Sequence, residues 1–283
     1  MSIVFAGIAP HPPILIPEIG GSDSKKVEKT ANALLDLGQK LNATEPDTII
    51  IISPHGLLYP DRMNVCGMEK LFGNFGQFDH PEISFLFKND LELAEKIDKA
   101  ANKDEIETLL YHNGKNEYEL DHGTLVPLYF LTKNLDNPVK ILPIAYSFQD
   151  RAKHYSFGQT IAEVCKNTYE RIAIIASGDL SHRLFPQSFM DNTKAGIEFD
   201  KKLLRLIETN DIQEILNLDE EFVERAGECA YHSILILLGV IEKLNYQSKV
   251  LSYEGPFGVG YMVVNFGIKD FDAFKHSSFD SSG

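Results

Sequence analysis

The chain has 283 residues, of which 43% are hydrophobic and 24% are charged, and this composition is that of a globular and not of a disordered protein. Its formal net charge of −14 argues against nucleic acids and anionic membranes as partners, because both require a basic protein surface. The three cysteines form no C-x-x-C pair, which favours a reducing compartment. The apolar N-terminal segment follows no basic region, and no apolar run approaches the about 20 residues of a membrane span, so we expect a soluble cytoplasmic protein.

Short β-branched segments alternate with longer amphipathic segments along the chain. They predict strands at residues 3–9, 48–53, 140–146, 171–177, 249–253 and 261–266, and helices at residues 24–41, 90–101, 124–134, 151–169, 192–209 and 227–244. This alternation predicts an α/β fold with a mostly parallel central sheet and helices on both faces. Residues 65–119 are less regular, and we interpret them as an insertion or a layer over the site. We expect one catalytic domain at residues 1–272 and a disordered tail at residues 273–283.

Three histidines lie within a few residues past the ends of predicted strands. His11 follows the first strand between prolines that restrict the backbone, His55 follows the strand TIIIIS, and His182 follows the strand RIAIIAS. In open α/β sheets, ligands bind in the crevice beyond the carboxyl ends of the strands. We therefore expect these three imidazoles to share one site.

Two further candidate residues stand at predicted helix starts. His122 lies where Asp121 or Thr124 could cap a helix, and Glu228 opens the apolar helix at residues 227–244. A carboxylate in a first helical turn is also favoured by the helix dipole alone, so a purely structural role of Glu228 stays open. Two histidines and one carboxylate are the facial ligand set of non-haem Fe(II) enzymes, although zinc and manganese can occupy the same ligands.

Five short motifs occur in the order of a known family. They are Pro10-His11-Pro12-Pro13, Ser53-Pro54-His55-Gly56, Asp121-His122-Gly123, Gly178-Asp179-Leu180-Ser181-His182 and Gly227-Glu228. With these motifs, which lie within about residues 3–241, the chain resembles the class III extradiol ring-cleavage dioxygenases. This is the family of the LigB-type catalytic subunit, to which the Memo-like proteins are related.

The resemblance implies a LigB/Memo-like domain that opens a catechol-like aromatic ring with O₂. It implies that His11, His55 and Glu228 bind Fe(II), with Zn(II), Mn(II) or Cu as alternative metals. His182 would be the acid/base residue beside the substrate and O₂, and His122 would hydrogen-bond a substrate hydroxyl. The expected partners are a small aromatic diol-like substrate and O₂, and a homodimer is expected because homo-oligomers are common.

The residue after Glu228 leaves a second interpretation open. Memo-like proteins place a cysteine where the dioxygenases place the carboxylate, and Cys229 directly follows Glu228. A thiolate suits zinc or copper, so that ligand would indicate a metal- or peptide-binding protein without ring cleavage. We favour Glu228, because the residue directly after Gly227 better matches the dioxygenase pattern.

Other polar residues receive no catalytic role. Arg183 could meet a substrate carboxylate, but we expect a solvated side chain. We expect the remaining histidines at the surface (His80, His112, His154), in local packing (His232) or in the tail (His276). The glycine-rich segment at residues 255–260 lies between two strands, which indicates a hairpin and not a dinucleotide loop.

Overall fold

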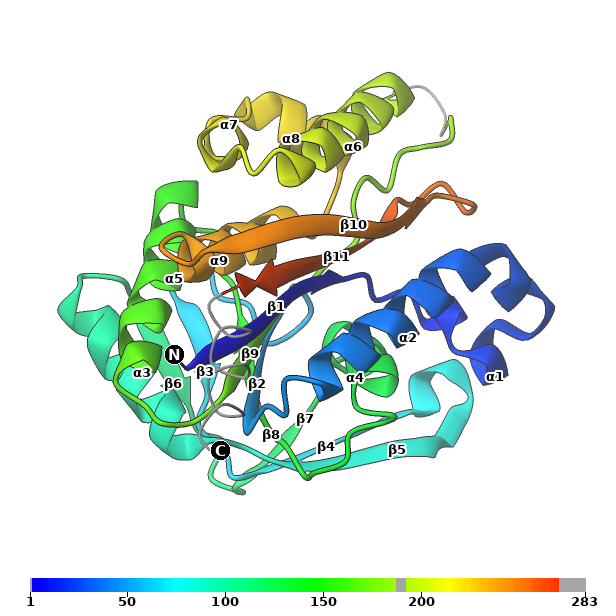
Figure 1. The fold of residues 1–283 in the computed structure, drawn as a ribbon. Coiled ribbons are helices and arrows are strands. Elements are labelled where there is room, and N and C mark those ends of the chain that lie inside the picture. The colour runs from blue at the N-terminus through cyan, green and yellow to red at the C-terminus, as the bar shows by residue number, and fades with distance from the viewer. Residues whose placement is uncertain (1, 187–191, 270–283) are drawn as a thin grey trace, which may run out of the picture.

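The computed structural model describes residues 2–186 and 192–269, so the predicted tail at residues 273–283, with His276, lies outside the described residues. An eight-stranded sheet in the order β10-β11-β1-β9-β2-β8-β3-β6 runs through the molecule (Figure 1). Its middle consists of four parallel strands, β1 (Ile3–Ala9), β9 (Ile172–Ser177), β2 (Thr48–Ser53) and β8 (Lys140–Ala145). Every residue of β1, β9 and β2 is buried, as continuous apolar runs predict for strands covered on both faces.

The edges of the sheet are mixed. On one side, β11 (Tyr261–Ile268) pairs antiparallel with β1, and β10 (Tyr246–Glu254) pairs antiparallel with β11 across the predicted turn at residues 255–260. On the other side, β3 (Met63–Cys66) is antiparallel to β8, and β6 (Thr108–Tyr111) is parallel to β3. The prediction of parallel strands therefore holds for the centre of the sheet, whereas the whole sheet is mixed.

Helices cover both faces of the sheet, as predicted. On one face lie α2 (Glu28–Asn42) and α4 (His122–Leu131), and on the other lie α3 (Leu91–Lys103), α5 (Arg151–Lys166) and α9 (Tyr231–Ile241) (Figure 1). Successive strand residues point to opposite faces. Ile50 and Ile52 consequently join the core with α5 and α9, while Ile49 and Ile51 join the core with α2 and α4.

Shorter elements complete the chain. After β1 come η1 (Pro13–Leu15), α1 (Pro17–Gly20) and η2 (Gly21–Val27), so the helix predicted at residues 24–41 begins as a 3₁₀ segment and becomes α-helical at residue 28. The helices α6 (Thr193–Glu208), α7 (Ile212–Leu216) and α8 (Glu220–Ala226) form a further layer beside β10 (Figure 1). In the described part of the chain, no helix is both long enough and apolar enough to cross a membrane.

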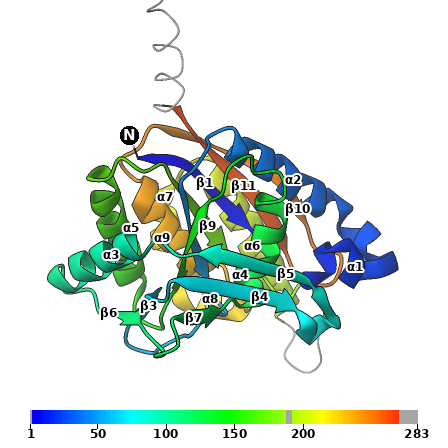
Figure 2. The ribbon, with the colours of Figure 1, turned by 90° about the horizontal axis from the view of Figure 1, so that it is seen from below.

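The segment at residues 65–119 is more regular than its sequence indicated. Besides β6 and α3, it holds a small sheet in the order β5-β4-β7, formed by β5 (His80–Lys88), β4 (Lys70–Phe75) and β7 (Glu117–Glu119). Figure 2 shows β4 and β5 lying beside α4. In β4 exposed and buried residues alternate, so the polar residues Lys70 and Asn74 face outward while Leu71, Gly73 and Phe75 are buried.

The helices α5 and α9 approach each other closely through two glycines. A Cβ atom on Gly158 would clash with the backbone carbonyl oxygen of Ile236, and one on Gly239 would clash with that of Tyr155. The absence of both side chains therefore sets the separation of these two helices.

We expect Gly158→Ala to destabilise the protein by about 1–3 kcal/mol, because overpacking forces the two backbones apart. The better helix propensity of alanine offsets about 1 kcal/mol of this effect. Gly267→Ala is the matched control, since no heavy atom lies closer than 3.6 Å to a Cβ atom built there. Urea unfolding of both variants measures the difference, and equal midpoints would contradict the proposed contact.

Candidate metal centre

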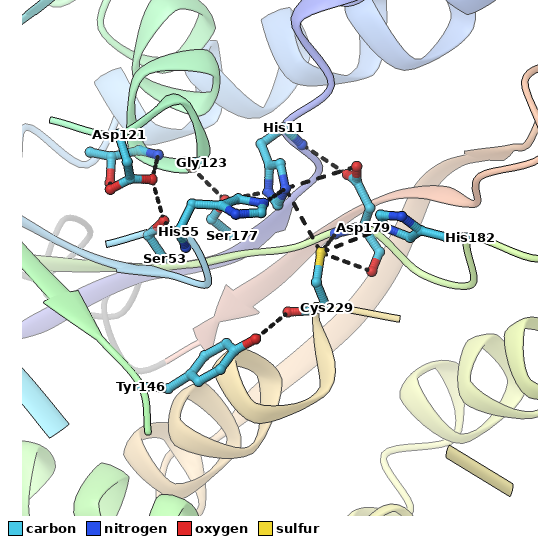
Figure 3. A network of polar contacts seen from close by, with 11 residues as sticks. His11, Ser53, His55, Asp121, Gly123, Tyr146, Ser177, Asp179, His182 and Cys229 are labelled. Carbon is cyan, nitrogen blue, oxygen red and sulfur yellow. Dashed lines mark hydrogen bonds and ion pairs between the residues drawn. The ribbon is translucent and has the colours of Figure 1, made fainter. Parts of the chain in front are cut away.

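Three parallel strands deliver polar side chains to one edge of the sheet. His11 follows β1, His55 follows β2, and Asp179 and His182 follow β9, which lies between β1 and β2. Figure 3 shows these side chains gathered around one point, together with Cys229 from the turn before α9. The structure thus brings His11, His55 and His182 together, as the positions of the strands predict.

Three of these side chains form a group of metal-ligand type. Nε2 of His11 lies 3.0 Å from Nε2 of His55 and 3.8 Å from Sγ of Cys229. The ligand atoms of these three residues all lie within 4.8 Å of one another. Within the described residues, this is the group of histidine, cysteine and acidic side chains that could hold a metal ion.

The carboxylate of Glu228 does not belong to this group. Its Oε2 accepts a hydrogen bond from the backbone N–H of Tyr231 at 2.5 Å, so it caps the first turn of α9. Glu228 also lines a different cavity, of about 600 Å³, and burial raises its pKa to about 7. The expected ligand set of His11, His55 and Glu228 is therefore not the set that the structure assembles, which has Cys229 in the third position.

Hydrogen bonds fix the tautomer of His11. The hydroxyl of Ser177 donates to the carbonyl of Gly123 at 2.5 Å, so its oxygen accepts from Nδ1–H of His11 at 3.0 Å. Nε2 of His11 then carries a lone pair that points at the other two candidate ligands. Burial, with His55 as the next cause, lowers the pKa of His11 well below its usual value, which keeps the ring neutral and able to bind a metal.

Asp179 is a buried carboxylate that the sequence motif contained but to which no role was assigned. Its Oδ1 accepts from the backbone N–H of His11 at 3.0 Å, and its own N–H donates to Sγ of Cys229 at 3.2 Å. Burial raises the pKa of Asp179 to about 6, and burial also raises the pKa of the Cys229 thiol. Its position two residues after a fully buried strand was the signal that could have identified it.

The donor set fits a metal ion. Around one zinc-like ion, neighbouring ligand atoms lie about 3 to 3.5 Å apart. The two Nε2 atoms of His11 and His55 are 3.0 Å apart, and Nε2 of His11 is 3.8 Å from Sγ of Cys229, which comes close to this range. A neutral imidazole with a fixed tautomer is the form that metals bind. The thiol would lose its proton on metal binding, because only the thiolate is a ligand.

The two histidines outside this group flank it on different sides. The ring of His122 stacks on His55 with 4.2 Å between the ring centroids, and Nε2 of His182 lies 3.8 Å from Sγ of Cys229. Asp121 caps α4 by accepting from Thr124 N–H at 3.0 Å, which places His122 in the first turn. Both predicted acid/base residues therefore border the group.

The loop that carries His182 is tied to the outer helical layer. Ser181 N–H donates to Asp200 of α6 at 2.9 Å, and the Ser181 hydroxyl donates to the carbonyl of Ala226 at 2.8 Å. The guanidinium of Arg183 donates to the carbonyl of Arg225 at 2.9 Å. Arg183 is partly exposed, as expected for a solvated side chain, and its guanidinium contacts the backbone at the end of α8.

The position of His154 differs from the expectation. This side chain is fully buried, and its Nδ1 and Nε2 lie 2.8 Å and 3.1 Å from the carbonyl oxygens of Asp150 and Ser147. His154 lies on α5, and the polar residues around it in the sequence end up on the other side of the helix. Its ring packs against His232 with 4.4 Å between centroids, which agrees with the expected local packing of His232.

A cavity of about 540 Å³ opens beside the group. His55 and His122 line it, together with residues of the segment at 65–119, namely Asn74, Gln77, Tyr111, Asn113, Tyr118 and Glu119. The small sheet and its neighbouring loops therefore form one wall of the site, as the interpretation of that segment as a layer over the site predicted.

Comparisons with known proteins match nearly the whole chain. The family model of the catalytic LigB subunit of aromatic ring-opening dioxygenase matches residues 6–264. Protein CA_C1420 of Clostridium acetobutylicum is 34% identical over 98% of this chain, and the chain spans 59% of the length of that protein. The beta subunit of 2-aminophenol 1,6-dioxygenase from a Pseudomonas species is 23% identical, with 94% of each chain covered.

Two further comparisons concern proteins without a stated reaction. A MEMO1 family protein of Methanocaldococcus jannaschii is 24% identical over 85% of this chain and 75% of its own length. The crystal structure of an uncharacterised protein from Escherichia coli K12 has a TM-score of 0.62 and 16% identity, and it covers 93% of this chain and 100% of its own. This structural likeness shows a shared fold, and the match to the LigB family model gives that fold its family.

We expect Ser177→Ala to weaken metal binding by about 10- to 100-fold, because outer hydrogen-bond partners orient metal-binding imidazoles. Ser233→Ala is the matched control, since the Ser233 hydroxyl is buried and has no hydrogen-bond partner among the described residues. Titration of both variants with Zn(II) or Fe(II) measures the affinities. Equal affinities in the two variants would contradict the role of Ser177.

Proposed function

The chain belongs to the family of the catalytic LigB subunit of aromatic ring-opening dioxygenases, and we propose that it is a metal-dependent oxidoreductase. In this proposal, His11, His55 and Cys229 hold the metal, and His122 and His182 act as acid/base groups. The proposed reaction is the opening of a catechol-like ring by O₂ next to two vicinal oxygens.

One observation carries this proposal. Two imidazoles and a thiol have their ligand atoms within 4.8 Å of one another, at the edge of the sheet where α/β proteins bind ligands. Beside them lies a cavity of about 540 Å³, large enough for a small aromatic molecule. The family of ring-opening dioxygenases provides the reaction class.

The metal, when bound, supplies Lewis-acid and redox chemistry to the oxygens of the substrate. Fe(II) is our first choice because of the family, and zinc or copper are the alternatives that a thiolate ligand favours. The chain itself orients the ligands through Ser177 and Asp179, which hold the ring and the backbone of His11.

The remaining histidines move protons in this proposal. His122 borders the cavity, and we assign it the hydrogen bond to a substrate hydroxyl, while His182 lies on the side of Cys229. Burial lowers the pKa of both imidazoles below the usual value, so both rings are neutral near neutral pH and can accept a proton. In this proposal each ring accepts a proton from the substrate side and returns it later in the reaction.

A second candidate function is favoured by Cys229 itself. A soft thiolate in place of a carboxylate suits a redox-inert zinc ion or copper, as expected for a Memo-like metal-binding protein without ring cleavage. Similarity to a MEMO1 family protein supports this alternative. The metal and the reaction with O₂ separate the two functions.

We expect Cys229→Ala and His11→Ala to lose bound metal, because each removes one of three ligands. Glu228→Ala should retain metal and lose about 0.5–2 kcal/mol of stability, as expected for a lost helix cap. Anaerobic loading with Fe(II), followed by metal quantification and urea unfolding, measures both effects. Retention of metal by Cys229→Ala with its loss from Glu228→Ala would restore the carboxylate as the third ligand.

The reaction itself is tested by O₂ uptake of the Fe(II)-loaded protein with catechol and 2-aminophenol. O₂ uptake that requires the substrate and is lost in His11→Ala supports the proposed oxidoreductase function. Stoichiometric binding of zinc or copper without any O₂ uptake would instead establish the metal-binding alternative.

We expect His182→Ala to keep the metal and to slow turnover by about 10²- to 10⁴-fold, the usual contribution of general acid–base catalysis. His80→Ala is the matched control, because His80 contacts Glu82 at 2.8 Å at the start of β5 and lines none of the cavities described above. Steady-state rates of O₂ uptake measure the effect. An unchanged rate in His182→Ala would remove its proposed role.

A further inference from the structure

The cavity beside His55 and His122 has an unusual charge pattern. Its lining combines three side-chain amides, two tyrosines and two carboxyl groups: Asn74, Gln77, Asn113, Tyr111, Tyr118, Glu119 and Asp121. Neither lysine nor arginine is among the described residues that line it. A ligand in this cavity therefore meets hydrogen-bonding groups and negative charge, but no positive side chain.

The arginine that directly follows the motif ending at His182 already binds backbone carbonyl groups. Arg183 follows His182 and was the candidate partner of a substrate carboxylate. Its Nη1 donates to the carbonyl oxygens of Arg225 at 2.9 Å and of Glu224 at 3.4 Å, which leaves it at the end of α8. No arginine that could form the bidentate pair by which proteins usually bind carboxylates is therefore among the described residues that line this cavity.

The groups that do face the cavity suit a neutral or cationic ligand. Gln77 forms no side-chain hydrogen bond with a described residue, so its amide is free to meet a ligand. The ring of His122 stacks on His55 and meets Phe78 edge-on, with centroids at 4.2 Å and 6.0 Å, so an aromatic cluster borders the cavity. Glu119 is exposed at the rim, where its carboxyl group can meet an amine.

We propose that the substrate of this site carries no carboxylate on the part that enters the cavity, and that it is a neutral or amine-bearing ring with adjacent oxygens. This inference rests on the proposed function, because it assumes that the ligand of the metal extends into this cavity. A carboxylate there would lose water without gaining a cationic partner. Repulsion between such a ligand carboxylate and one protein carboxylate about 8 Å away would weaken binding by roughly 2-fold at an effective dielectric constant of about 80 and by roughly 30-fold at about 20.

The test uses three catechols that differ in one substituent. They are 4-methylcatechol, 3,4-dihydroxybenzylamine and 3,4-dihydroxybenzoate, which are neutral, cationic and anionic at this position. Anaerobic calorimetry on the metal-loaded protein measures their dissociation constants. We expect the benzoate to bind at least about tenfold more weakly than the methyl compound, and the benzylamine to bind at least as tightly as the methyl compound.

A charge variant tests the location of the effect. Gln77→Arg adds a cation to the cavity wall and should improve benzoate binding by about tenfold while weakening benzylamine binding. Gln213→Arg is the matched control, because Gln213 is an exposed residue of α7 that lines none of the described cavities. We expect this control to leave all three affinities unchanged.

The outcomes separate this inference from the proposed function. If the catechols bind but the benzoate binds as tightly as 4-methylcatechol, the selectivity is overturned and the metal-dependent reaction stands. The same conclusion follows if Gln77→Arg and Gln213→Arg behave alike, because the cavity then does not receive the substituent. If none of the three catechols binds to the metal-loaded protein, the inference and the proposed substrate class both fail.

Discussion

The parallel pairing of β1, β9 and β2 is the constraint on which the site depends. Ala9 lies opposite Ser177 in the register of β1 and β9, and Ile52 lies opposite Ala176 in that of β2 and β9. All three strands consequently end at one edge, and the next few residues of each chain segment meet there. Ser177 itself, the last residue of β9, hydrogen-bonds the ring of His11. The same register that buries the sheet therefore orients a candidate metal ligand.

Much of this arrangement could be predicted from the sequence. Continuous β-branched runs indicated the central strands, and histidines directly after them indicated a shared site, because strand ends leave little freedom in where the next residues lie. The small sheet was harder to predict, since β4 alternates buried and exposed residues and its sequence resembles a polar loop. His154 was also misjudged, because backbone carbonyls of its own helix start and of a preceding turn satisfy its ring, and a sequence pattern does not reveal such partners.

The choice between Glu228 and Cys229 depends on backbone geometry that sequence patterns do not specify. Gly227 adopts a left-handed conformation with φ of 61° at the end of α8, and the chain then turns into α9. In this turn the carboxylate reaches the N–H of Tyr231, while Sγ of Cys229 faces His11. A carboxylate at a helix start satisfies free N–H groups as readily as it binds a metal, so its residue type alone left both roles possible.

The turn at Gly227–Ala230 has a consequence for how such proteins can diverge. It holds a hard oxygen donor and a soft sulfur donor on neighbouring residues, and only the course of the backbone decides which of them faces the histidines. A sequence change that redirects this single loop would bring the oxygen donor to the histidines in place of the sulfur donor, with the imidazoles, the sheet and the cavity preserved.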